Sequence, residues 1–581
     1  MRSGGSGWRT YLALISSVIN AYSLVCGLLG LAAVVSALLA PESWVTVALI
    51  LLGVAAVLAS PLTHLVRAGF DPQRTATLIG ENVWPRLILL IAALVLTGDS
   101  GPRTLVIVLG GLVGILLLAE QSVRRPLTRA TPQVANLPGW EVPEPSQALG
   151  TWLYGLVTLA LLLTGASAMT GLTPVPAAVA VLASFIVTGV VFVQLVRYQR
   201  QRQRLEANLP RILADLGPAF AFHWQAPAGT AYQATMWLPY LKRLERPWFV
   251  LVRTDANFRE LTALTDAPII LRQNLEDLDA VVCPSLKVVF YANTAVRNSH
   301  MIRFPHLTHI QLNHGDSDKI ASVSPVFRQY DRNFVAGQAA IDRFAIHGVK
   351  TQPDQLVIVG RPQLEDVRRA RGPVGELTDR VVLYSPTWSG FYEDSDYSSL
   401  RAATVIVGAL LERGCTVIFR PHPYSRRHRA NAEACDQTIA LLAADAEATG
   451  RKHVFGPQAE TAMSLFDCFN ASDAMVSDVS SVVSDYLASG KPFAMAAVSA
   501  HGEAFAREFP QSAAGYVFDV ATGSVPGFDQ VLDAMLGADP KQATRDELRV
   551  YYLGDSPAGK VADRFIQTAR SYLDDTGDAA N

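Results

Sequence analysis

Six apolar stretches before residue 200 constrain this chain more than any other feature of its sequence. They cover roughly Val18–Leu39, Trp44–Ser60, Asn82–Thr97, Thr104–Ala119, Thr151–Thr173 and Val175–Val196. A helix needs about 20 mostly apolar residues to cross the hydrocarbon core of a bilayer. The third stretch is the weakest candidate, because Pro85 and Arg86 shorten its apolar core. Residues 1–200 are therefore predicted to form an α-helical membrane bundle of about six transmembrane helices.

Basic residues between the stretches predict the orientation of this bundle. They gather at the N-terminus, in two of the connections and after the last stretch, at Arg2, Arg9, Arg67, Arg74, Arg124, Arg125, Arg129, Arg197, Arg200, Arg202 and Arg204. The connections on the other side are short and carry at most one basic residue each. By the positive-inside rule, the chain is a multi-pass protein of the cell membrane with both termini in the cytoplasm.

The near absence of charge inside the stretches favours anchoring over transport. Apart from Arg86, no Asp, Glu, Lys, Arg or His lies within the six ranges, whereas ion and proton pathways usually need such groups. We therefore expect the bundle to anchor the chain or to grip a lipid-linked substrate, and lipid flipping stays open. The basic segment Arg197–Arg204 is interpreted as a stop-transfer signal, with contact to anionic membrane lipids as the alternative.

Composition excludes several classes of function. The 581 residues carry a net charge of −2, so no overall basic field points to nucleic acid. The five cysteines form no CxxC pair, which disfavours a disulfide framework or a zinc site. At this length the chain has room for three or four domains, at about 150 residues each.

From about Pro218 short apolar runs alternate with helical stretches, a pattern typical of parallel α/β sheets. A polar break at Val367–Leu377 interrupts the alternation, which then restarts. The pattern predicts two α/β domains, over residues 205–370 and 378–570, and a frayed acidic tail over residues 571–581. Because ligands of open α/β sheets bind beyond the carboxyl ends of the strands, a cleft between the two domains is expected.

One candidate motif follows an apolar strand at Thr308–Leu312. The strand delivers His314 to its carboxyl end, where Gly315 permits a tight turn. A histidine near its ordinary pKa can take a proton from an attacking hydroxyl. A turn histidine bonded to backbone is an equally good interpretation of this spacing.

Two more strand ends in the second domain carry basic and aromatic groups. After Thr416–Phe419, Arg420 could hold phosphate with both guanidinium nitrogens, and His422 could donate to a phosphate oxygen or a leaving group. After Val381–Tyr384, Thr387 and Trp388 could line a nucleotide site. The alternatives are a rigid proline-containing loop and a structural turn.

A fourth motif combines hydroxyls with the start of a helix. The strand Ala474–Val476 is followed by Asp478, Ser480 and Ser481, and a helix is expected from Val482. Helix N-termini offer free N–H groups to phosphate, and serine hydroxyls add donors. Plain capping of the helix by serine is the common alternative.

Taken in order, these motifs resemble the CDP-glycerol glycerophosphotransferase family, which makes teichoic-acid-type polymers. The resemblance is carried by His314-Gly315, Tyr384–Trp388, Arg420–His422, Ser477–Tyr486 and a late Gly559–Arg564 segment. It extends from about His314 to Arg564 and leaves out the membrane half. After Gly315 this chain has Asp-Ser-Asp in place of the family's Thr-Pro-Leu-like residues, so the acceptor is open.

The resemblance implies a GT-B fold of two Rossmann-like domains with a donor and an acceptor side. It further implies transfer of glycerol phosphate, or a related polyol phosphate, from a CDP-activated donor to a hydroxyl of a lipid-linked or polymeric acceptor, with release of CMP. His314 and His422 are the predicted catalytic residues. The predicted donor-binding residues are Arg420, Ser480, Ser481, Asp478, Thr387 and Trp388, and those on the acceptor side are Gly315, Asp316 and Asp318.

No obligatory cofactor or metal is expected, although Asp316 and Asp318 have the spacing of a metal clamp. The basic residues Arg426, Arg427 and Arg429 are interpreted as a solvated loop, with an anionic acceptor as the alternative. Competing functions are a GT-B glycosyltransferase that uses a nucleotide sugar, a non-catalytic membrane scaffold, and a lipid flippase with a regulatory domain. Oligomeric state is left open.

Overall fold

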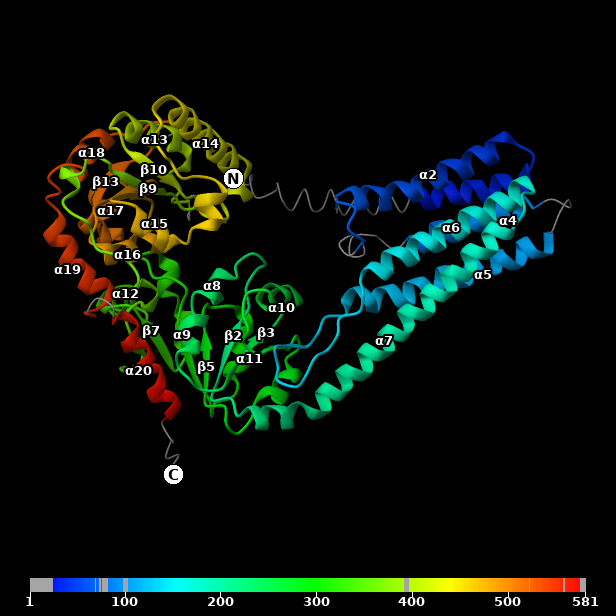
Figure 1. The fold of residues 1–581 in the computed structure, drawn as a ribbon, viewed down its shortest axis with the longest axis horizontal. Coiled ribbons are helices and arrows are strands. Elements are labelled where there is room, and N and C mark those ends of the chain that lie inside the picture. Colours follow the sequence, from blue (N-terminus) through cyan, green and yellow to red (C-terminus); the bar gives the residue numbers. More distant parts are fainter. Residues whose placement is uncertain are drawn as a thin grey trace. The chain divides into compact units, whose positions relative to one another are not determined.

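The structure, a computed structural model, describes residues 25–67, 69–72, 75, 82–97, 103–390, 396–521, 523–556 and 560–574. The chain divides into two compact units. One comprises the described residues up to Asn208 without Asn136–Pro138, and the other comprises Asn136–Pro138 and the residues from Leu209 onward. Figure 1 shows the helices and strands of both, and each unit is described separately below.

Helices make up nearly all of the first unit (Figure 1). They are Val25–Leu39, α2 (Trp44–Arg67), α4 (Val83–Val95), α5 (Arg103–Arg129), α6 (Ala148–Thr170) and α7 (Val175–Leu216), with a two-residue strand β1 (Val134–Ala135). Among the described residues, α2, α5, α6 and α7 are long and apolar enough to cross a membrane, whereas Val25–Leu39 and α4 are shorter. Each of the six predicted stretches is thus helical where it is described, and residues 18–24 lie outside the described part.

A buried ion pair lies inside the first unit, just beyond a predicted apolar stretch. Helix α5 continues past Ala119, where the stretch ends, to Arg129 and so includes Glu120. The Glu120 carboxylate accepts from both Nη atoms of Arg86, at 2.8 and 3.0 Å, and from Arg124 at 3.0 Å. Arg86 also lies 4.3 Å from the ring centroid of Tyr154 in α6. The helix bundle therefore contains charged groups besides Arg86, and they tie α4, α5 and α6 together.

A parallel sheet begins the second unit. Its strands are β2 (Phe220–Trp224), β3 (Trp248–Val252), β4 (Ile269–Leu271), β5 (Val288–Tyr291), β6 (Thr308–Gln311), β7 (Arg332–Val335) and β8 (Leu356–Ile358). The order β4-β3-β2-β5-β6-β7-β8 reverses direction between β2 and β5. Helices α8 (Tyr232–Thr235), α9 (Leu238–Lys242), α10 (Asp255–Thr262), α11 (Ser299–Ile302) and α12 (Gln338–Ile346) connect the strands.

The second sheet is also parallel and has the order β10-β9-β11-β12-β13. Its strands are β9 (Val381–Ser385), β10 (Thr416–Phe419), β11 (Ala474–Ser477), β12 (Phe493–Ala497) and β13 (Tyr516–Asp519). The helices are α13 (Ala403–Glu412), α14 (Arg429–Thr449), α15 (Leu465–Ala471), α16 (Ser481–Tyr486), α17 (Gly502–Glu508), α18 (Phe528–Met535), α19 (Gln542–Leu553) and α20 (Val561–Asp574). Here the order reverses between β9 and β11, and such reversals are where open α/β sheets bind ligands.

The last helix, α20, returns to the first sheet, although it follows the second domain in sequence (Figure 1). Phe565 packs against Trp237 and Phe334, with ring centroids 5.3 and 6.1 Å apart. The backbone carbonyl of Leu573 accepts from Lys287 at 3.0 Å. The predicted second domain of residues 378–570 thus ends in a helix that covers the first one. Residues 571–574, predicted as frayed tail, are the last turn of α20.

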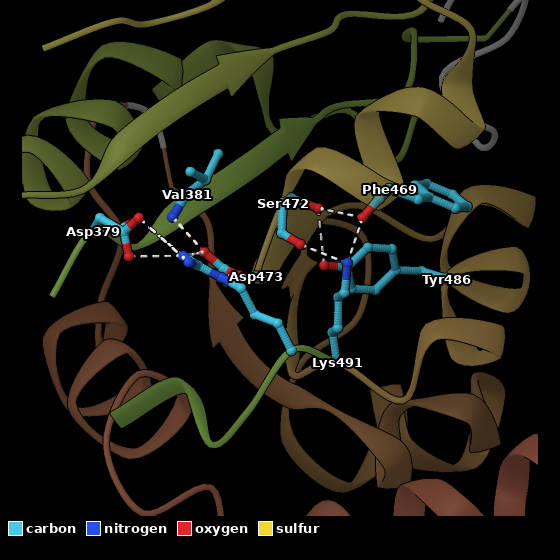
Figure 2. A network of polar contacts seen from close by, with 8 residues as sticks. Asp379, Val381, Phe469, Ser472, Asp473, Tyr486 and Lys491 are labelled. Carbon is cyan, nitrogen blue, oxygen red and sulfur yellow. Dashed lines mark hydrogen bonds and ion pairs between the residues drawn. The ribbon is translucent and has the colours of Figure 1, made fainter. Parts of the chain in front are cut away.

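Polar contacts hold the second sheet together at the amino ends of its strands (Figure 2). Asp473 accepts from the backbone N–H of Val381 at 2.9 Å and from Arg371, in the predicted linker, at 2.7 Å. Lys491 is buried, and its ammonium donates to the carbonyls of Phe469 and Ser472 at 2.7 and 2.6 Å. Burial lowers the pKa of Lys491 to about 8.

Replacing this lysine is expected to destabilise the second sheet domain. In Lys491→Met the two carbonyls stay buried without a donor, which costs roughly 1–3 kcal/mol. The free energy of unfolding of the full chain in urea measures the loss. Lys452→Met, at an exposed position, is the control and should leave it unchanged. Equal stability of the two variants would contradict a structural role for Lys491.

Candidate functional site

Loops at the carboxyl ends of β6, β9, β10 and β11 carry most of the predicted site residues. One of these strands belongs to the first sheet and three to the second. The loops meet inside the second unit, next to the strand-order reversal between β9 and β11. The site is built below residue by residue, beginning with the first domain.

His314 is fixed in one orientation beyond the end of β6. Its Nδ1 lies 3.0 Å from the carbonyl oxygen of Ala292, and an N–H must lie between these two atoms for a bond to form. The neutral ring then carries its proton on Nδ1, and Nε2 has a free lone pair. Burial lowers the pKa of His314, with a contribution from Arg361, so the ring is uncharged at neutral pH. A free Nε2 on an uncharged ring is the state that a general base requires.

Gly315 brings this loop against the second domain. A β-carbon added at Gly315 would lie 2.9 Å from Oγ and 3.0 Å from Cβ of Ser481. Ser480 caps α16, because its Oγ accepts from the backbone N–H of Val482 at 3.2 Å. The absence of a side chain at Gly315 thus lets the predicted base lie beside the two serines that were predicted to bind the donor.

Asp478 lies buried at the reversal point of the second sheet. One carboxylate oxygen, Oδ2, accepts from the backbone N–H groups of Thr387 and Ser399 at 2.7 and 3.2 Å. The other, Oδ1, has no hydrogen-bond partner among the described residues. Burial raises the pKa of Asp478 to about 7, although these bonds and Lys319 lower it. Asp478 and Thr387 therefore shape the loop after β9 from within and are not exposed to a ligand.

Lys319 is a functional candidate that the sequence motifs did not single out. It follows His314 by five residues in the same loop, and its ammonium lies 5.0 Å from the ring centroid of Tyr397. Burial lowers the pKa of Lys319 to about 8, and the charge of Asp478 opposes that shift. Lys319 also lowers the pKa of His422. The Lys319 ammonium, which belongs to the first domain, thus reaches the predicted donor side. The sequence signal that could have identified Lys319 is its position after the His-Gly turn.

His422 has the opposite tautomer to His314. Its Nδ1 accepts from the backbone N–H of Tyr424 at 3.1 Å, so the neutral ring carries its proton on Nε2. Burial, together with Lys319 and Arg427, lowers the pKa of His422 to about 4. The ring stacks on Trp388 with centroids 6.1 Å apart. His422 can therefore act as a neutral N–H donor beside an aromatic surface.

Arg420 is engaged by the backbone instead of standing free beside His422. Its Nη1 donates to the carbonyl of Met463 at 2.7 Å and also to that of Ala459. These bonds hold the segment Gln458–Ala462 in place. The predicted phosphate-binding role of Arg420 thus has at most part of its guanidinium available.

Asp316 and Asp318 form ion pairs with one arginine. Nη1 of Arg343 in α12 lies 2.5 Å from Asp316, and Nη2 lies 3.1 Å from Asp318. Asp318 also accepts from the backbone N–H of Gln511 in the second domain at 3.0 Å and from Tyr552 at 3.0 Å. The pair therefore neutralises Arg343 and connects the domains. Groups of three or more metal-ligating side chains do not occur in the described part of the chain.

A buried ion pair between Arg361 and Asp485 of α16 joins the two domains. Arg361, which follows β8, donates to Asp485 from Nε at 2.9 Å and from Nη2 at 3.1 Å. Asp485 is the second acidic residue of the Ser477–Tyr486 motif, and sequence reasoning did not assign it to a contact.

The arginines of the predicted basic loop also have partners. Arg426 pairs with Asp436 and Glu460, and Arg429 pairs with Glu433, whereas Arg427 lies over the ring of Tyr424.

Comparisons with known proteins match a segment that contains the Tyr384–Trp388, Arg420–His422 and Ser477–Tyr486 motifs. Residues 352–501 match the family model described as CDP-Glycerol:Poly(glycerophosphate) glycerophosphotransferase. The teichoic acid ribitol-phosphate primase of Bacillus spizizenii is 25% identical over 185 residues, which are 30% of this chain and 42% of that protein. The chain thus spans less than half the length of this relative.

Solved structures to which the chain is similar include the wall teichoic acid polymerase TagF and a UDP-N-acetylglucosamine 2-epimerase. TagF is 13% identical at a TM-score of 0.41, covering 65% of this chain and 98% of its own. The epimerase is 13% identical at a TM-score of 0.39, covering 62% and 98%. Together with the family model, the sequence relative confirms the resemblance to CDP-glycerol glycerophosphotransferases.

The buried carboxyl of Asp478 predicts a pH-dependent stability difference. A carboxyl whose pKa is raised to about 7 in the fold binds more protons there than in the unfolded chain, where its pKa is about 3.9. Its contribution to stability is complete below pH 4 and is lost as the pH rises through 7. Asp478→Asn keeps the bonds to Thr387 and Ser399 without the charge. From pH 4 to pH 8, the free energy of unfolding of this variant should rise by roughly 2–4 kcal/mol relative to that of the natural chain.

Urea unfolding of both proteins across that range measures the difference. A constant difference between them would show that Asp478 is charged throughout, and the described burial would then be wrong. Asp396→Asn serves as a control, because that carboxyl is only partly buried and pairs with Arg401.

The contact between Gly315 and Ser481 predicts a coupled pair of substitutions. Gly315→Ala places a β-carbon within 3.0 Å of Ser481 and should destabilise the chain by roughly 1–3 kcal/mol. Ser481→Gly removes the atoms that clash. In that background, the cost of Gly315→Ala should fall by more than half, as measured by a double-mutant cycle of unfolding free energies. Additive costs would show that the two loops do not touch.

Proposed function

We propose, from the resemblance to CDP-glycerol glycerophosphotransferases, that this chain transfers glycerol phosphate or a related polyol phosphate from a CDP-activated donor. The acceptor is a hydroxyl of a lipid-linked or cell-wall polymer, and CMP is released. The observation that carries the proposal is that His314 and His422, on loops of the two domains, are uncharged histidines with opposite tautomers. One is held as a proton acceptor and the other as a proton donor.

In the proposed reaction, Nε2 of His314 takes the proton of the acceptor hydroxyl. The hydroxyl oxygen attacks the distal phosphorus of the donor, and the bond from that phosphorus to the bridging oxygen breaks. CMP leaves with the electron pair of that bond, and Nε2–H of His422 donates to its phosphate. Positive charge from Lys319 and the hydroxyl of Ser481 stabilise the negative charge that develops between the loops.

The remaining predicted residues support this arrangement. Trp388 belongs to an aromatic cluster with His422, Tyr424 and His428, and the donor's base is proposed to bind beside this cluster. Arg420 holds the segment Gln458–Ala462 that borders the donor side. Asp316 and Asp318 orient the acceptor-side loop through Arg343.

The proposed location is the cell membrane, with the transferase domains in the cytoplasm. Four described helices are long and apolar enough to cross a bilayer, and the positive-inside rule assigns most of the basic residues that flank the apolar stretches to the cytoplasmic side. CDP-activated donors are then available to the site, and a lipid-linked acceptor is held close to it.

Release of CMP by the full chain tests the reaction. The purified protein in detergent is incubated with labelled CDP-glycerol and, separately, with labelled CDP-ribitol. His314→Gln and His422→Gln should each lower the rate by about 10²–10⁴-fold, because each removes a proton-transfer group. His347→Gln changes an exposed histidine and is the control. Turnover of a nucleotide sugar without CMP release from either CDP donor would overturn the proposal in favour of a glycosyltransferase.

The pH profile of the same reaction separates a base from a structural histidine. Because burial lowers the pKa of His314, the rate should be flat at neutral pH and fall only below the ordinary histidine value of about 6.5. In His314→Gln the residual rate should lose this acidic limb. An acidic limb that persists in the variant would assign it to another group.

A further inference from the structure

Helices α5 and α7 of the first unit enclose an apolar groove. Its volume is about 840 Å³, within the range of about 300–1,000 Å³ that is common for sites of small ligands. Its larger apolar lining residues are Val123, Pro126, Phe185, Phe192, Leu195 and Val196. No acidic side chain is among the described residues that form it.

The lining residues form one continuous stripe on each helix. On α5 they recur every three or four positions from Ala119 to Ala130, and on α7 from Phe185 to Arg202. This spacing places them on a single face. Seventeen steps along α7 correspond to about 25 Å at 1.5 Å per residue, which is long enough to receive an extended hydrocarbon chain.

Two arginines stand together at one end of the groove. Arg129 ends α5, and Arg202 lies one turn beyond Tyr198 on α7. The Tyr198 hydroxyl donates to the carbonyl of Thr131 at 2.8 Å, which fastens this end of the two helices. Within the described part of the chain, neither Arg129 nor Arg202 has a hydrogen-bond or ion-pair partner. An apolar channel with unpaired cations at one end is complementary to an anionic amphiphile.

We propose that this groove binds an anionic phospholipid, with one hydrocarbon chain along the α5–α7 channel and the phosphate between Arg129 and Arg202. Guanidinium groups bind phosphate oxygens with two parallel hydrogen bonds. The apolar stripe favours a ligand with a hydrocarbon chain over a free headgroup, which has nothing to fill the channel. The basic end corresponds to the side of the bundle that the flanking charges assign to the cytoplasm. The inference rests on the proposed membrane location and is independent of the proposed transfer reaction.

Native mass spectrometry of the full chain in detergent tests the site. The protein is titrated with phosphatidylglycerol and, separately, with phosphatidylcholine of the same chains. Phosphatidylglycerol should bind more tightly, and Arg129→Gln and Arg202→Gln should each weaken it about fivefold, the factor for one basic residue at a lipid surface. Arg204→Gln changes an exposed arginine of α7 outside the groove and should have no effect.

A second pair of variants tests the channel independently of charge. A β-carbon at Gly189, which lines the groove, meets no atom within 4 Å, so Gly189→Leu fills the channel without disturbing the backbone. It should abolish binding of phosphatidylglycerol. Gly111→Leu, equally uncrowded but outside the groove, is its control and should bind normally.

Three results would overturn the proposal. They are equal binding of the two lipids, equal effects of Arg202→Gln and Arg204→Gln, and displacement of the lipid by free glycerol phosphate. Release of the chain from membranes by alkaline carbonate would instead refute the proposed membrane location. The transfer reaction is tested separately by CMP release, independently of lipid binding and of membrane location.

Discussion

The buried ion pair between Arg361 and Asp485 holds the two parallel-sheet domains in one arrangement. Arg361 comes from the end of the first sheet and Asp485 from α16 of the second, and both are nearly excluded from solvent. Removing one partner of such a pair would leave an uncompensated buried charge, at a cost of about 3–5 kcal/mol. Asp318, bound to the backbone of Gln511, forms a second connection of the same kind. Through these contacts the first turn of α16 lies against the loop of Gly315.

The tautomers of His314 and His422 differ because their local hydrogen bonds differ. His314 donates its Nδ1 proton to a carbonyl, whereas His422 accepts from a backbone N–H, so one local hydrogen bond in each loop selects the tautomer. Burial keeps both rings neutral. Two identical side chains thereby become an acceptor and a donor, without any change in their own chemistry.

Much of the fold was predictable from sequence, because apolar alternation records local burial. The two parallel sheets and the loops that carry His314, His422, Asp478 and Ser481 follow from that pattern. The partners of these residues do not, since they lie far away along the chain. Asp318, for example, is neutralised by Arg343 and bound to Gln511, and neither contact leaves a mark in the Asp-Ser-Asp motif.

Other contacts were hidden from sequence for similar reasons. Arg420 was predicted to hold phosphate because it stands beside His422, and the carbonyls that its Nη1 binds lie some 40 residues away along the chain. Glu120 was left outside the apolar stretch because a carboxylate ends any hydropathy pattern. The ion pair with Arg86 offsets the cost of burying the Glu120 carboxylate. That pair depends on the packing of α4 against α5. Lys319 was overlooked because a lysine in a polar loop is ordinarily solvated.

The return of α20 to the first sheet has a consequence for how the protein is made. Phe565 covers Trp237 and Phe334, side chains that emerge from the ribosome more than 200 residues earlier. Until the last helix is synthesised, that part of the first sheet has no cover, and the second domain must fold as an insertion between two halves of the first. The first domain is therefore completed only after α20 has been synthesised.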